Sequence, residues 1–376
     1  MKNQVVIVSS YEFSDTNATK ARLYALLDNM SHNFQVTFIC PGYDSSLNDK
    51  NIKIINLGKN LSIKSFLFRA LYEIFYAIKV RYQLKKLGYP NIIITIPSIF
   101  LLILLINKKY KSVVDVRDLV WDYLPKKNYY QRLMKQILKY SMLSLLRHAD
   151  TIFTTNNQEK KYLINNLRNY YGDINVLTNG INKKRFCKIS KIKETGKKDI
   201  ILYIGNIGLA QNLITLIDVI KIMPSLELYI IGKGVELNRL KDYTKKNQIK
   251  NISFLGGLNW NEILPYYEKA NMLYAQISEE YKTAIPSKLY EYLSTGIPII
   301  FAGTGASENF LSKFENVMTI PPNNSNALKN AIEKIWRMEK KISNKNKFII
   351  EEKYIRENQV DKIMPHLNKI LSVSDK

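Results

Sequence analysis

The chain has 376 residues, 46% of them hydrophobic, which favours two domains with sizeable cores and excludes a disordered chain. Two cysteines, Cys40 and Cys187, are too few for a disulfide framework, and the start of the chain has no signal-peptide core, so a reduced, cytoplasmic protein is expected. The formal net charge of +24 predicts an anionic partner, such as nucleic acid, acidic lipid or a phosphorylated substrate, although A/T-rich codon usage also favours lysine.

Short apolar runs alternate with helical patterns along the chain, which predicts an α/β fold with parallel sheets. In the first half these runs predict strands at 5–9, 36–40, 52–57, 92–96, 113–117, 151–154 and 175–177, and the longest helices at 62–87 and 129–148. In the second half they predict strands at 200–204, 226–231, 252–255, 272–275, 299–301 and 317–320. The polar, lysine-rich residues 184–199 between the halves are interpreted as a linker.

One apolar stretch, residues 92–106, is the candidate for a membrane span. It is shorter than the roughly 20 residues that cross a bilayer, and Pro97 and Ser98 interrupt it. We interpret it as a buried strand, a turn and a buried helix. Each half of the chain then forms a Rossmann-like sheet, and the two halves imply a cleft in which ligands bind at the carboxyl ends of the strands.

A helix is predicted to start at Pro286, whose missing N–H is not needed in a first helical turn. Ser287 is the expected cap and Gly296 the expected stop. At about 100° per residue, Leu289 and Leu293 share one face of this helix, which is therefore expected to pack on the core.

The opposite face of the same helix carries Ser287, Lys288 and Glu291. The amides of the first turn form an anion site, worth roughly 0.3–1 kcal/mol, to which Lys288 adds a positive charge. Glu291 can accept hydrogen bonds from paired hydroxyl groups such as those of a ribose. A diphosphate and a ribose together describe a nucleotide, so a nucleotide-sugar site is predicted. The alternative is a solvated Lys288–Glu291 ion pair on the surface.

The segment beginning at Pro286, PSKLYEYLSTGIPII, resembles the nucleotide-binding helix of glycosyltransferases with the two-Rossmann GT-B fold, family 4 in particular. Other segments resemble the strands and glycine loops of the family's donor domain: YIGNIGLAQNL, LYIIGKGVELNRL and FLGGLNWNEILPYYEKANMLY. The segment VLTNGINKKRF resembles the one that closes the acceptor domain. The segment VVDVRDLVWD resembles one found in a branch that acts on cell-surface polysaccharides.

This resemblance covers nearly the whole chain and implies two Rossmann-like domains facing a central cleft. It implies an acceptor-binding domain at 1–184, a donor-binding domain at 185–352 and a C-terminal helix at 353–376 that packs back on the first domain. The donor nucleotide-sugar site it implies consists of Gly205, Asn206, Gly208, Gln211, Gly232, Lys233, Gly234, Leu258, Thr283, Pro286, Ser287, Lys288, Leu289 and Glu291.

The chain departs from the family pattern at three of these positions. Many members carry a glutamate where this chain has Thr283, so the contact to the transferred sugar does not carry over. Many also hold the diphosphate with an arginine and a lysine, where this chain has Asn206 and Gln211. Lys288, the helix amides and the glycine loop are then expected to hold the diphosphate.

The sequence indicates the residues that would bind the acceptor less clearly than those that would bind the donor. Many family members use a histidine before an aspartate, and the matching pair here is Arg117–Asp118. Asp118 is a candidate to orient or deprotonate an acceptor hydroxyl, and a structural Arg–Asp pair or a helix cap is the alternative. Asn17 and Thr19 lie at a helix start whose amides could face the donor phosphate, or could simply be capped.

Neither an Asp-x-Asp motif nor a HExxH or CxxC motif occurs in the sequence, so no metal or cofactor is expected. The helix predicted at 62–87 mixes aromatic and basic side chains: Lys64, Phe66, Phe68, Arg69, Phe75, Tyr76, Lys79, Arg81, Lys85 and Lys86. With Lys108, Lys109 and Lys111, it is expected to contact an anionic membrane, and a core-packing helix with a basic solvated face is the alternative.

The function that these residues and the resemblance favour is transfer of a sugar from a nucleotide-diphosphate-sugar, a UDP-sugar in particular, to a saccharide or lipid-linked acceptor in bacterial surface-polysaccharide synthesis. The resemblance implies retention at the anomeric carbon. Two other functions stay open at this point. One is a UDP-sugar epimerase of the same fold, which the scarcity of histidine disfavours. The other is nucleic-acid binding by the basic surface, which gives no reason for the face with Lys288 and Glu291.

Overall fold

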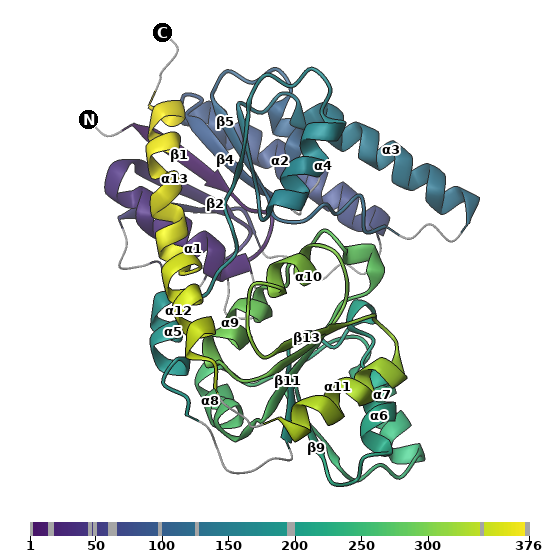
Figure 1. Cartoon of the computed structure of the whole chain (residues 1–376). Coiled ribbons are helices and arrows are strands. Elements are labelled where there is room, and N and C mark those ends of the chain that lie inside the picture. Colours follow the sequence, from purple (N-terminus) through teal and green to yellow (C-terminus); the bar gives the residue numbers. More distant parts are fainter. Residues whose placement is uncertain are drawn as a thin grey trace. The chain divides into compact units, whose positions relative to one another are not determined.

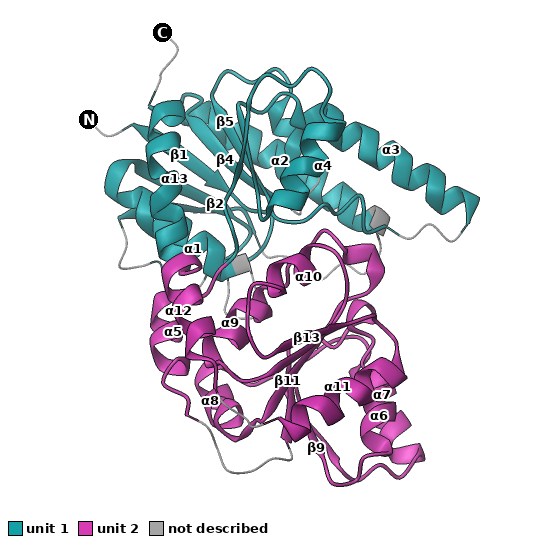
Figure 2. Cartoon of the chain, viewed as in Figure 1, with its two compact units in different colours: residues 1–179, 356–376 teal, residues 180–355 magenta. Residues whose placement is uncertain are grey.

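The computed structural model describes residues 3–13, 19–43, 47, 51–58, 66–96, 100–124, 128–193, 200–338 and 342–372 (Figure 1). The chain divides into two compact units (Figure 2). Unit 1 comprises Met1–Asn179 together with Arg356–Lys376, and unit 2 comprises Gly180–Ile355. Unit 1 therefore ends before the expected boundary at residue 184, and the chain returns to it at Arg356.

Unit 1 is built on a seven-stranded parallel sheet with the strand order β3-β2-β1-β4-β5-β6-β7. Its strands are β1 (Gln4–Val8), β2 (Gln35–Cys40), β3 (Ile52–Asn56), β4 (Asn91–Ile96), β5 (Ser112–Val116), β6 (Thr151–Thr154) and β7 (Asp173–Val176). Its helices are α1 (Thr19–Asn33), α2 (Phe66–Lys86), the 3-10 helix η2 (Phe100–Leu105), α3 (Tyr129–Leu146), α4 (Asn157–Asn166) and α13 (Arg356–Leu371). The central strands are near-continuous Val and Ile runs because helices cover both faces of the sheet.

Helix α13 packs on α1 within unit 1 (Figure 1). Its apolar side chains Val360, Ile363, Met364, Leu367 and Leu371 are buried in the same core as Leu23, Leu26 and Leu27 of α1. The end of the chain thereby completes the core that its first residues begin.

Unit 2 is built on a six-stranded parallel sheet with the strand order β10-β9-β8-β11-β12-β13. Its strands are β8 (Ile200–Ile204), β9 (Glu227–Ile231), β10 (Ile252–Gly256), β11 (Met272–Gln276), β12 (Ile299–Ala302) and β13 (Val317–Ile320). Its helices are α5 (Lys183–Ile189), η3 (Leu209–Gln211), α6 (Ile214–Lys221), α7 (Leu237–Lys246), α8 (Trp260–Lys269), η4 (Glu279–Tyr281), α9 (Ser287–Thr295), α10 (Ala306–Leu311), α11 (Ser325–Arg337) and α12 (Asn344–Lys353).

The predicted α/β class is confirmed, because every predicted strand is present and all pairings are parallel. The predicted linker is wrong in its first half, since α5 occupies residues 183–189 and buries Phe186 and Ile189 in the core of unit 2. Because only these two apolar side chains of α5 enter the core, the sequence of this lysine-rich helix is similar to that of a linker. Residues 194–199 lie outside the described part of the chain.

The apolar stretch at 92–106 forms β4 and then the buried 3-10 helix η2, while its predicted turn, with Pro97 and Ser98, lies outside the described residues. In the described part of the chain, no helix has both the length and the apolar character that crossing a membrane requires.

Candidate functional site

Helix α9 begins at the carboxyl edge of the unit 2 sheet, after the loop that follows β11. Pro286 occupies the cap position with a φ of −57° and makes no side-chain cap hydrogen bond, and no other described side chain bonds to the amides of the first turn. Ser287 is therefore the first helical residue and not the predicted cap. The helix ends at Gly296 as predicted, in the left-handed conformation with a φ of 74°. The uncapped first-turn amides leave a partial positive charge at this edge.

The core face of α9 fixes its position against the sheet. Leu289 and Leu293 are fully buried, as predicted. Tyr292 is also buried, and its hydroxyl oxygen accepts a 2.8 Å hydrogen bond from the backbone N–H of Ile204 at the end of β8. The helix is thus tied to the strand whose loop carries the first predicted glycines.

Lys288 is partly buried at the start of α9, where its side chain meets Tyr203. The ammonium Nζ lies 3.1 Å from the Tyr203 hydroxyl and 4.2 Å from the centre of its ring. Burial lowers the pKa of the Lys288 ammonium to about 7. Among the residues that the structure describes, no carboxylate forms an ion pair with Lys288. A cation with no counter-ion beside a helix amino end is suited to bind an anion.

The loops after β8, β9 and β10 interlock at this same edge, which explains three of the predicted glycines. The N–H of Gly205 bonds to Ile231 O at 2.9 Å, and the N–H of Gly232 bonds to Gly256 O at 2.7 Å. A Cβ on Gly205 would lie 2.6 Å from Lys288 Nζ, and one on Gly232 would lie 1.8 Å from Gly205 O. No side chain fits at Gly232, because the clash is with a backbone oxygen, whereas at Gly205 the Lys288 side chain would have to move and the φ of 142° disfavours any other residue.

The other predicted loop residues also lie at this edge. A Cβ on Gly234 would lie 2.2 Å from Ile207 O, so this glycine is required for the same reason. Asn206 donates through Nδ2 to Gln211 Oε1 at 3.2 Å, so these two amides hold each other. A Cβ on Gly208 would lie 2.6 Å from Asn206 Nδ2, which leaves no room for a side chain beneath this pair.

Three further predicted residues belong to loops of unit 2. The side chain of Lys233 is exposed in the loop after β9. Leu258, between β10 and α8, packs on the same core cluster as α9. Thr283 is partly buried in the segment between η4 and α9. The predicted donor residues are thus gathered in the loops that follow β8 to β11 and in the start of α9.

Glu291 is held by residues that the sequence did not reveal. Its Oε1 accepts hydrogen bonds from Trp260 Nε1 at 2.9 Å and from the Tyr267 hydroxyl at 3.3 Å. Its Oε2 lies 3.9 Å from a guanidinium nitrogen of Arg185, and this guanidinium lies over the Trp260 ring at 5.3 Å. The carboxylate is therefore fixed through one oxygen, and its side chain remains 19% exposed.

The alternative of a Lys288–Glu291 ion pair is wrong, because Lys288 turns to Tyr203 while Glu291 turns to Trp260 and Tyr267. Arg185 was not predicted as a site residue because it lies on α5, in the segment interpreted as a linker. The one available signal for this network was Trp260 itself, a tryptophan directly after a capping Asn259.

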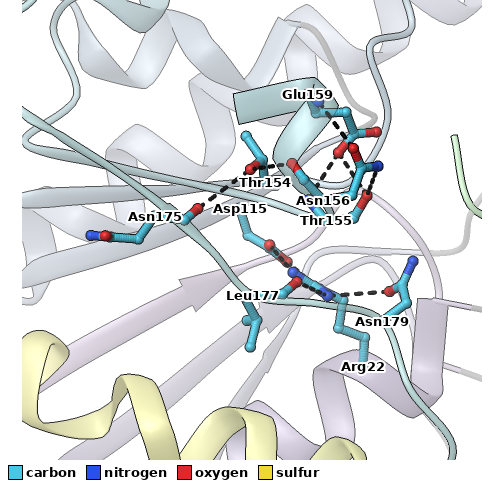
Figure 3. Close-up of polar contacts among 9 residues, drawn as sticks. All are labelled: Arg22, Asp115, Thr154, Thr155, Asn156, Glu159, Asn175, Leu177 and Asn179. Carbon is cyan, nitrogen blue, oxygen red and sulfur yellow. Dashed lines mark hydrogen bonds and ion pairs between the residues drawn. The ribbon is translucent and has the colours of Figure 1, made fainter. Parts of the chain in front are cut away.

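A second polar cluster lies at the carboxyl edge of the unit 1 sheet (Figure 3). Arg22 of α1 binds Asp115 of β5 with two bonds, Nε to Oδ2 at 2.9 Å and Nη2 to Oδ1 at 2.6 Å. Its Nη1 donates to Leu177 O at 2.9 Å and to Asn179 Oδ1 at 3.2 Å. This buried pair ties α1, β5 and the segment after β7 together.

Arg117 and Asp118 follow β5 but do not form the structural ion pair that was the alternative. Arg117 Nε and Nη1 are buried and have no hydrogen-bond partner, and burial lowers the pKa of this guanidinium. Burial raises the pKa of Asp118 to about 6, although Arg117 and Arg22 oppose the shift. Within the described residues, the Asp118 carboxylate makes no hydrogen bond. A partly buried carboxylate of this kind can accept a proton near neutral pH.

Glu159, in the first turn of α4, is a buried acid that the sequence analysis missed. Its Oε2 accepts bonds from the Thr155 N–H at 2.9 Å and the Thr155 hydroxyl at 2.6 Å, whereas Oε1 has no partner (Figure 3). Burial raises the pKa of Glu159 to about 8, and Asp118 adds to the shift. Asn156 caps α4, so the pattern Asn-x-x-Glu was the available signal for this residue.

The remaining predicted residues cannot be assessed as contacts. Asn17 lies outside the described residues, and Thr19 begins α1 but its side chain is not described. Among the described residues, no group of three or more His, Cys, Asp or Glu side chains could hold a metal ion. The absence of a metal from the reaction stays a prediction.

Residues 185–354 match the model of the family described as glycosyl transferases group 1. The match includes the glycine loops, α9 and Glu291 and so covers the whole of the site in unit 2. Unit 2 therefore matches a glycosyltransferase domain, and the whole chain has the GT-B fold. No curated protein matches the sequence.

Several solved glycosyltransferase structures are similar to this chain in fold. Sucrose-phosphate synthase from Thermosynechococcus elongatus has a TM-score of 0.79 at 17% identity, with 99% of this chain and 100% of that chain covered. HepE from Anabaena, in complex with UDP-glucose, has a TM-score of 0.72 at 13% identity and coverages of 97% and 99%. WaaG, a glycosyltransferase involved in lipopolysaccharide biosynthesis, has a TM-score of 0.70 at 12% identity and coverages of 98% and 100%.

Proposed function

We propose that this chain is a glycosyltransferase that transfers a sugar from a UDP-sugar to a saccharide or lipid-linked saccharide acceptor in bacterial surface-polysaccharide synthesis, with retention at the anomeric carbon. The observation that carries the proposal is Lys288, a partly buried cation that forms no ion pair with the described residues, at an uncapped helix amino end. HepE was solved with UDP-glucose and WaaG is involved in lipopolysaccharide biosynthesis, and both support the class of donor and acceptor.

The reaction breaks the bond between the anomeric carbon and a diphosphate oxygen, and the electron pair of that bond stays on the departing UDP. The acceptor oxygen forms the new bond to the anomeric carbon and loses its proton. Lys288, the first-turn amides of α9 and the loop N–H groups stabilise the negative charge that grows on the diphosphate. These donors are fixed before the reaction by the interlocked loops at Gly205 and Gly232, so little reorganisation is needed.

Glu291 is proposed to bind the ribose hydroxyl groups through Oε2. Trp260 and Tyr267 already occupy Oε1, so they orient the carboxylate without consuming its second oxygen. Hydrogen bonds from hydroxyl groups to a carboxylate oxygen are stronger than those between neutral groups, and Arg185 lies 3.9 Å from Oε2. Asn206 and Gln211 are proposed to bind the diphosphate less strongly than charged residues do, because each is an amide already bonded to the other.

The acceptor is proposed to bind at the carboxyl edge of unit 1, where Asp118 and Arg117 have unused hydrogen-bonding capacity. Asp118 is proposed to orient the attacking hydroxyl or to accept its proton. No metal or other cofactor is proposed to take part. Contact with anionic lipid on the cytoplasmic face of the membrane is also proposed, supported by the exposed cations of α2 and by the net charge of +24.

The test is turnover of UDP-glucose, UDP-galactose and UDP-N-acetylglucosamine in the presence of a detergent extract of bacterial membranes as the acceptor mixture. One donor is expected to release UDP only when the extract is present, with its labelled sugar moving into the lipid or polysaccharide fraction. The configuration of the new bond is read by NMR. Label that stays entirely as free sugar, or no donor consumption at all, contradicts the proposal.

A further inference from the structure

Helix α2 exposes a row of large apolar side chains to solvent. Its members are Phe68, Leu71, Phe75, Ile78 and Tyr82, with 67%, 53%, 64%, 59% and 57% of their surface exposed. Their spacing of three and four residues places them along one line of the helix. We call this row the α2 stripe. An exposed row of five such side chains is unusual for a surface that faces only water.

The α2 stripe has no role in the core of unit 1. The helix buries Tyr76, Ala77, Val80 and Leu84, which lie on the opposite side at about 100° per residue. Tyr76 also donates a 2.7 Å hydrogen bond to Ser9 O, so it belongs to the core and not to the expected membrane contact. The packing of α2 is therefore complete without the α2 stripe.

Exposed cations flank the α2 stripe, and among the described residues of α2 itself there is no exposed carboxylate. Lys79, Arg81, Lys85 and Lys86 are exposed. The single acidic residue of α2, Glu73, is buried and bonds to Arg69. The exposed side chains of α2 from residue 68 onward are thus apolar or cationic, and its partly exposed polar residues, such as Gln83, are neutral.

Helix α3 has a second exposed apolar row, which the sequence analysis did not foresee. Tyr129, Tyr130, Leu133, Ile137 and Tyr140 are 81%, 68%, 42%, 50% and 73% exposed, and we call this row the α3 stripe. The helix buries Met142, Leu143 and Leu146 on its other side and contains no acidic residue. Both α2 and α3 pack against η2 and belong to one rigid core.

Part of the predicted cationic group forms ion pairs within unit 1. Lys108 and Lys111 both pair with Asp150, so they are engaged within unit 1, and only Lys109 of that group stays exposed. Lys64 lies outside the described residues, and the side chain of Phe66 is not described. Fewer exposed cations than predicted are therefore present to attract anionic lipid, so the apolar side chains are expected to contribute a larger share of the lipid contact.

We propose that the α2 and α3 stripes insert together into the interface of an anionic bilayer, with the α2 cations bound to lipid head groups. A second copy of this surface would bring cations against cations, which disfavours self-association. Tyr and Phe side chains are suited to the head-group boundary, where an apolar body and a polar tip are both satisfied. This inference extends the lipid contact proposed above and does not depend on the glycosyl-transfer reaction.

The test is sedimentation of the full chain with vesicles of phosphatidylcholine containing 30% phosphatidylglycerol, against phosphatidylcholine alone. Binding is expected on the anionic vesicles, with a fraction that persists in 0.5 M NaCl because apolar insertion is not screened. Neutralising Lys79, Arg81, Lys85 and Lys86 to Gln is expected to weaken binding by roughly 600-fold, since each cation near the surface contributes about fivefold.

Apolar variants separate insertion from adsorption. Phe68→Ser with Phe75→Ser is expected to remove the salt-resistant fraction, and Tyr129→Ser with Tyr140→Ser to reduce it. The matched control is Ile222→Ser with Phe348→Ser, which removes side chains 62% and 64% exposed in unit 2 and is expected to leave binding unchanged. Circular dichroism and the UDP affinity of each variant verify that the fold and the nucleotide site are intact.

Three outcomes overturn the inference. The first is no sedimentation of a folded, UDP-binding chain with anionic vesicles, which leaves the proposed reaction untouched. The second is vesicle binding that all apolar variants retain in 0.5 M NaCl. The third is a dimer in analytical ultracentrifugation that Phe68→Ser dissociates, which assigns the surface to a second copy of the chain.

Discussion

Lys288 Nζ lies 4.2 Å from the centre of the Tyr203 ring and 3.1 Å from its hydroxyl, and no carboxylate among the described residues pairs with it. The ring face attracts the cation, but water and counter-ions are largely removed. Gly205 lies directly beside this ammonium, because a Cβ there would be 2.6 Å from Nζ. The ammonium therefore lies next to backbone N–H groups, where it can bind a diphosphate.

Replacing Lys288 by Met is expected to weaken UDP binding about 10- to 100-fold, because a charged hydrogen bond contributes roughly 1.5–3 kcal/mol. The melting temperature is expected to stay the same or rise, since the variant no longer buries a cation that lacks an ion pair. Titration calorimetry and thermal unfolding measure the two effects. The control is Lys269→Met, an exposed lysine at the end of α8. Equal UDP affinity in Lys288→Met and the wild type contradicts the assignment.

UDP affinity is expected to fall as the pH rises from 7 to 9. Burial lowers the pKa of free Lys288 to about 7, and a bound diphosphate raises this pKa again. Binding therefore takes up a proton above pH 7, and Kd is expected to increase by as much as about tenfold per pH unit. Lys288→Arg, which stays charged, is expected to show a flat profile. If the Kd of the wild type for UDP depends on pH in the same way as that of Lys288→Arg, this prediction is wrong.

Glu291→Gln is expected to abolish the preference for a ribose that has both hydroxyl groups. The amide oxygen of Gln can still accept from Trp260 and Tyr267, so the fold is preserved, but the second position becomes a donor. The wild type is expected to bind UDP roughly tenfold more tightly than 2′,3′-dideoxyuridine diphosphate. Calorimetry with both nucleotides measures the ratio, and a ratio unchanged in Glu291→Gln places the ribose elsewhere.

Gly232→Ala is expected to destabilise unit 2 far more than Gly256→Ala. Both glycines have a positive φ, 155° and 74°, so both variants carry backbone strain of about 1–2 kcal/mol. Only at Gly232 does the added Cβ meet a backbone oxygen, at 1.8 Å, and the loops at Gly205 and Gly232 must then separate. Thermal unfolding and UDP binding of the two variants check this. Equal behaviour means that the interlocked loops are not required.

Glu159→Gln is expected to gain stability over the wild type as the pH rises from 5 to 8. Burial raises the folded pKa of Glu159 to about 8, above the unfolded value near 4.3, so the folded wild type holds an extra proton across this range. The free energy of unfolding of the wild type therefore declines between pH 5 and pH 8. Above pH 8 the contribution of Glu159 to it no longer changes with pH. Melting curves at several pH values, with Glu351→Gln as an exposed control on α12, test the sign. A difference in melting temperature that does not depend on pH overturns it.

Local sequence signals were enough for the elements that depend on short-range chemistry. Pro286 and Gly296 mark the limits of α9, and runs of Val and Ile mark each strand, because proline, glycine and β-branched residues restrict the backbone directly. The same holds for Gly205 and Gly232, although the reason for them, contact between two loops, appeared only in the fold.

Contacts between distant segments could not be predicted in this way. Trp260 lies 31 residues before Glu291, and Arg22 lies 93 residues before Asp115. Neither pair leaves a pattern in the local sequence. Glu159 was missed because a glutamate on a helix is ordinarily a solvated residue, and only the fold reveals that it is fully buried.

The central claim is that α9 and the glycine loops of unit 2 bind a nucleoside diphosphate. Titration calorimetry of the wild-type chain with UDP, GDP, ADP and CMP tests it most directly. We predict one site per chain with UDP the tightest ligand, and CMP much weaker because it lacks the second phosphate that Lys288 binds. Equal affinity for CMP and UDP, or no binding by any of the four, would contradict the account.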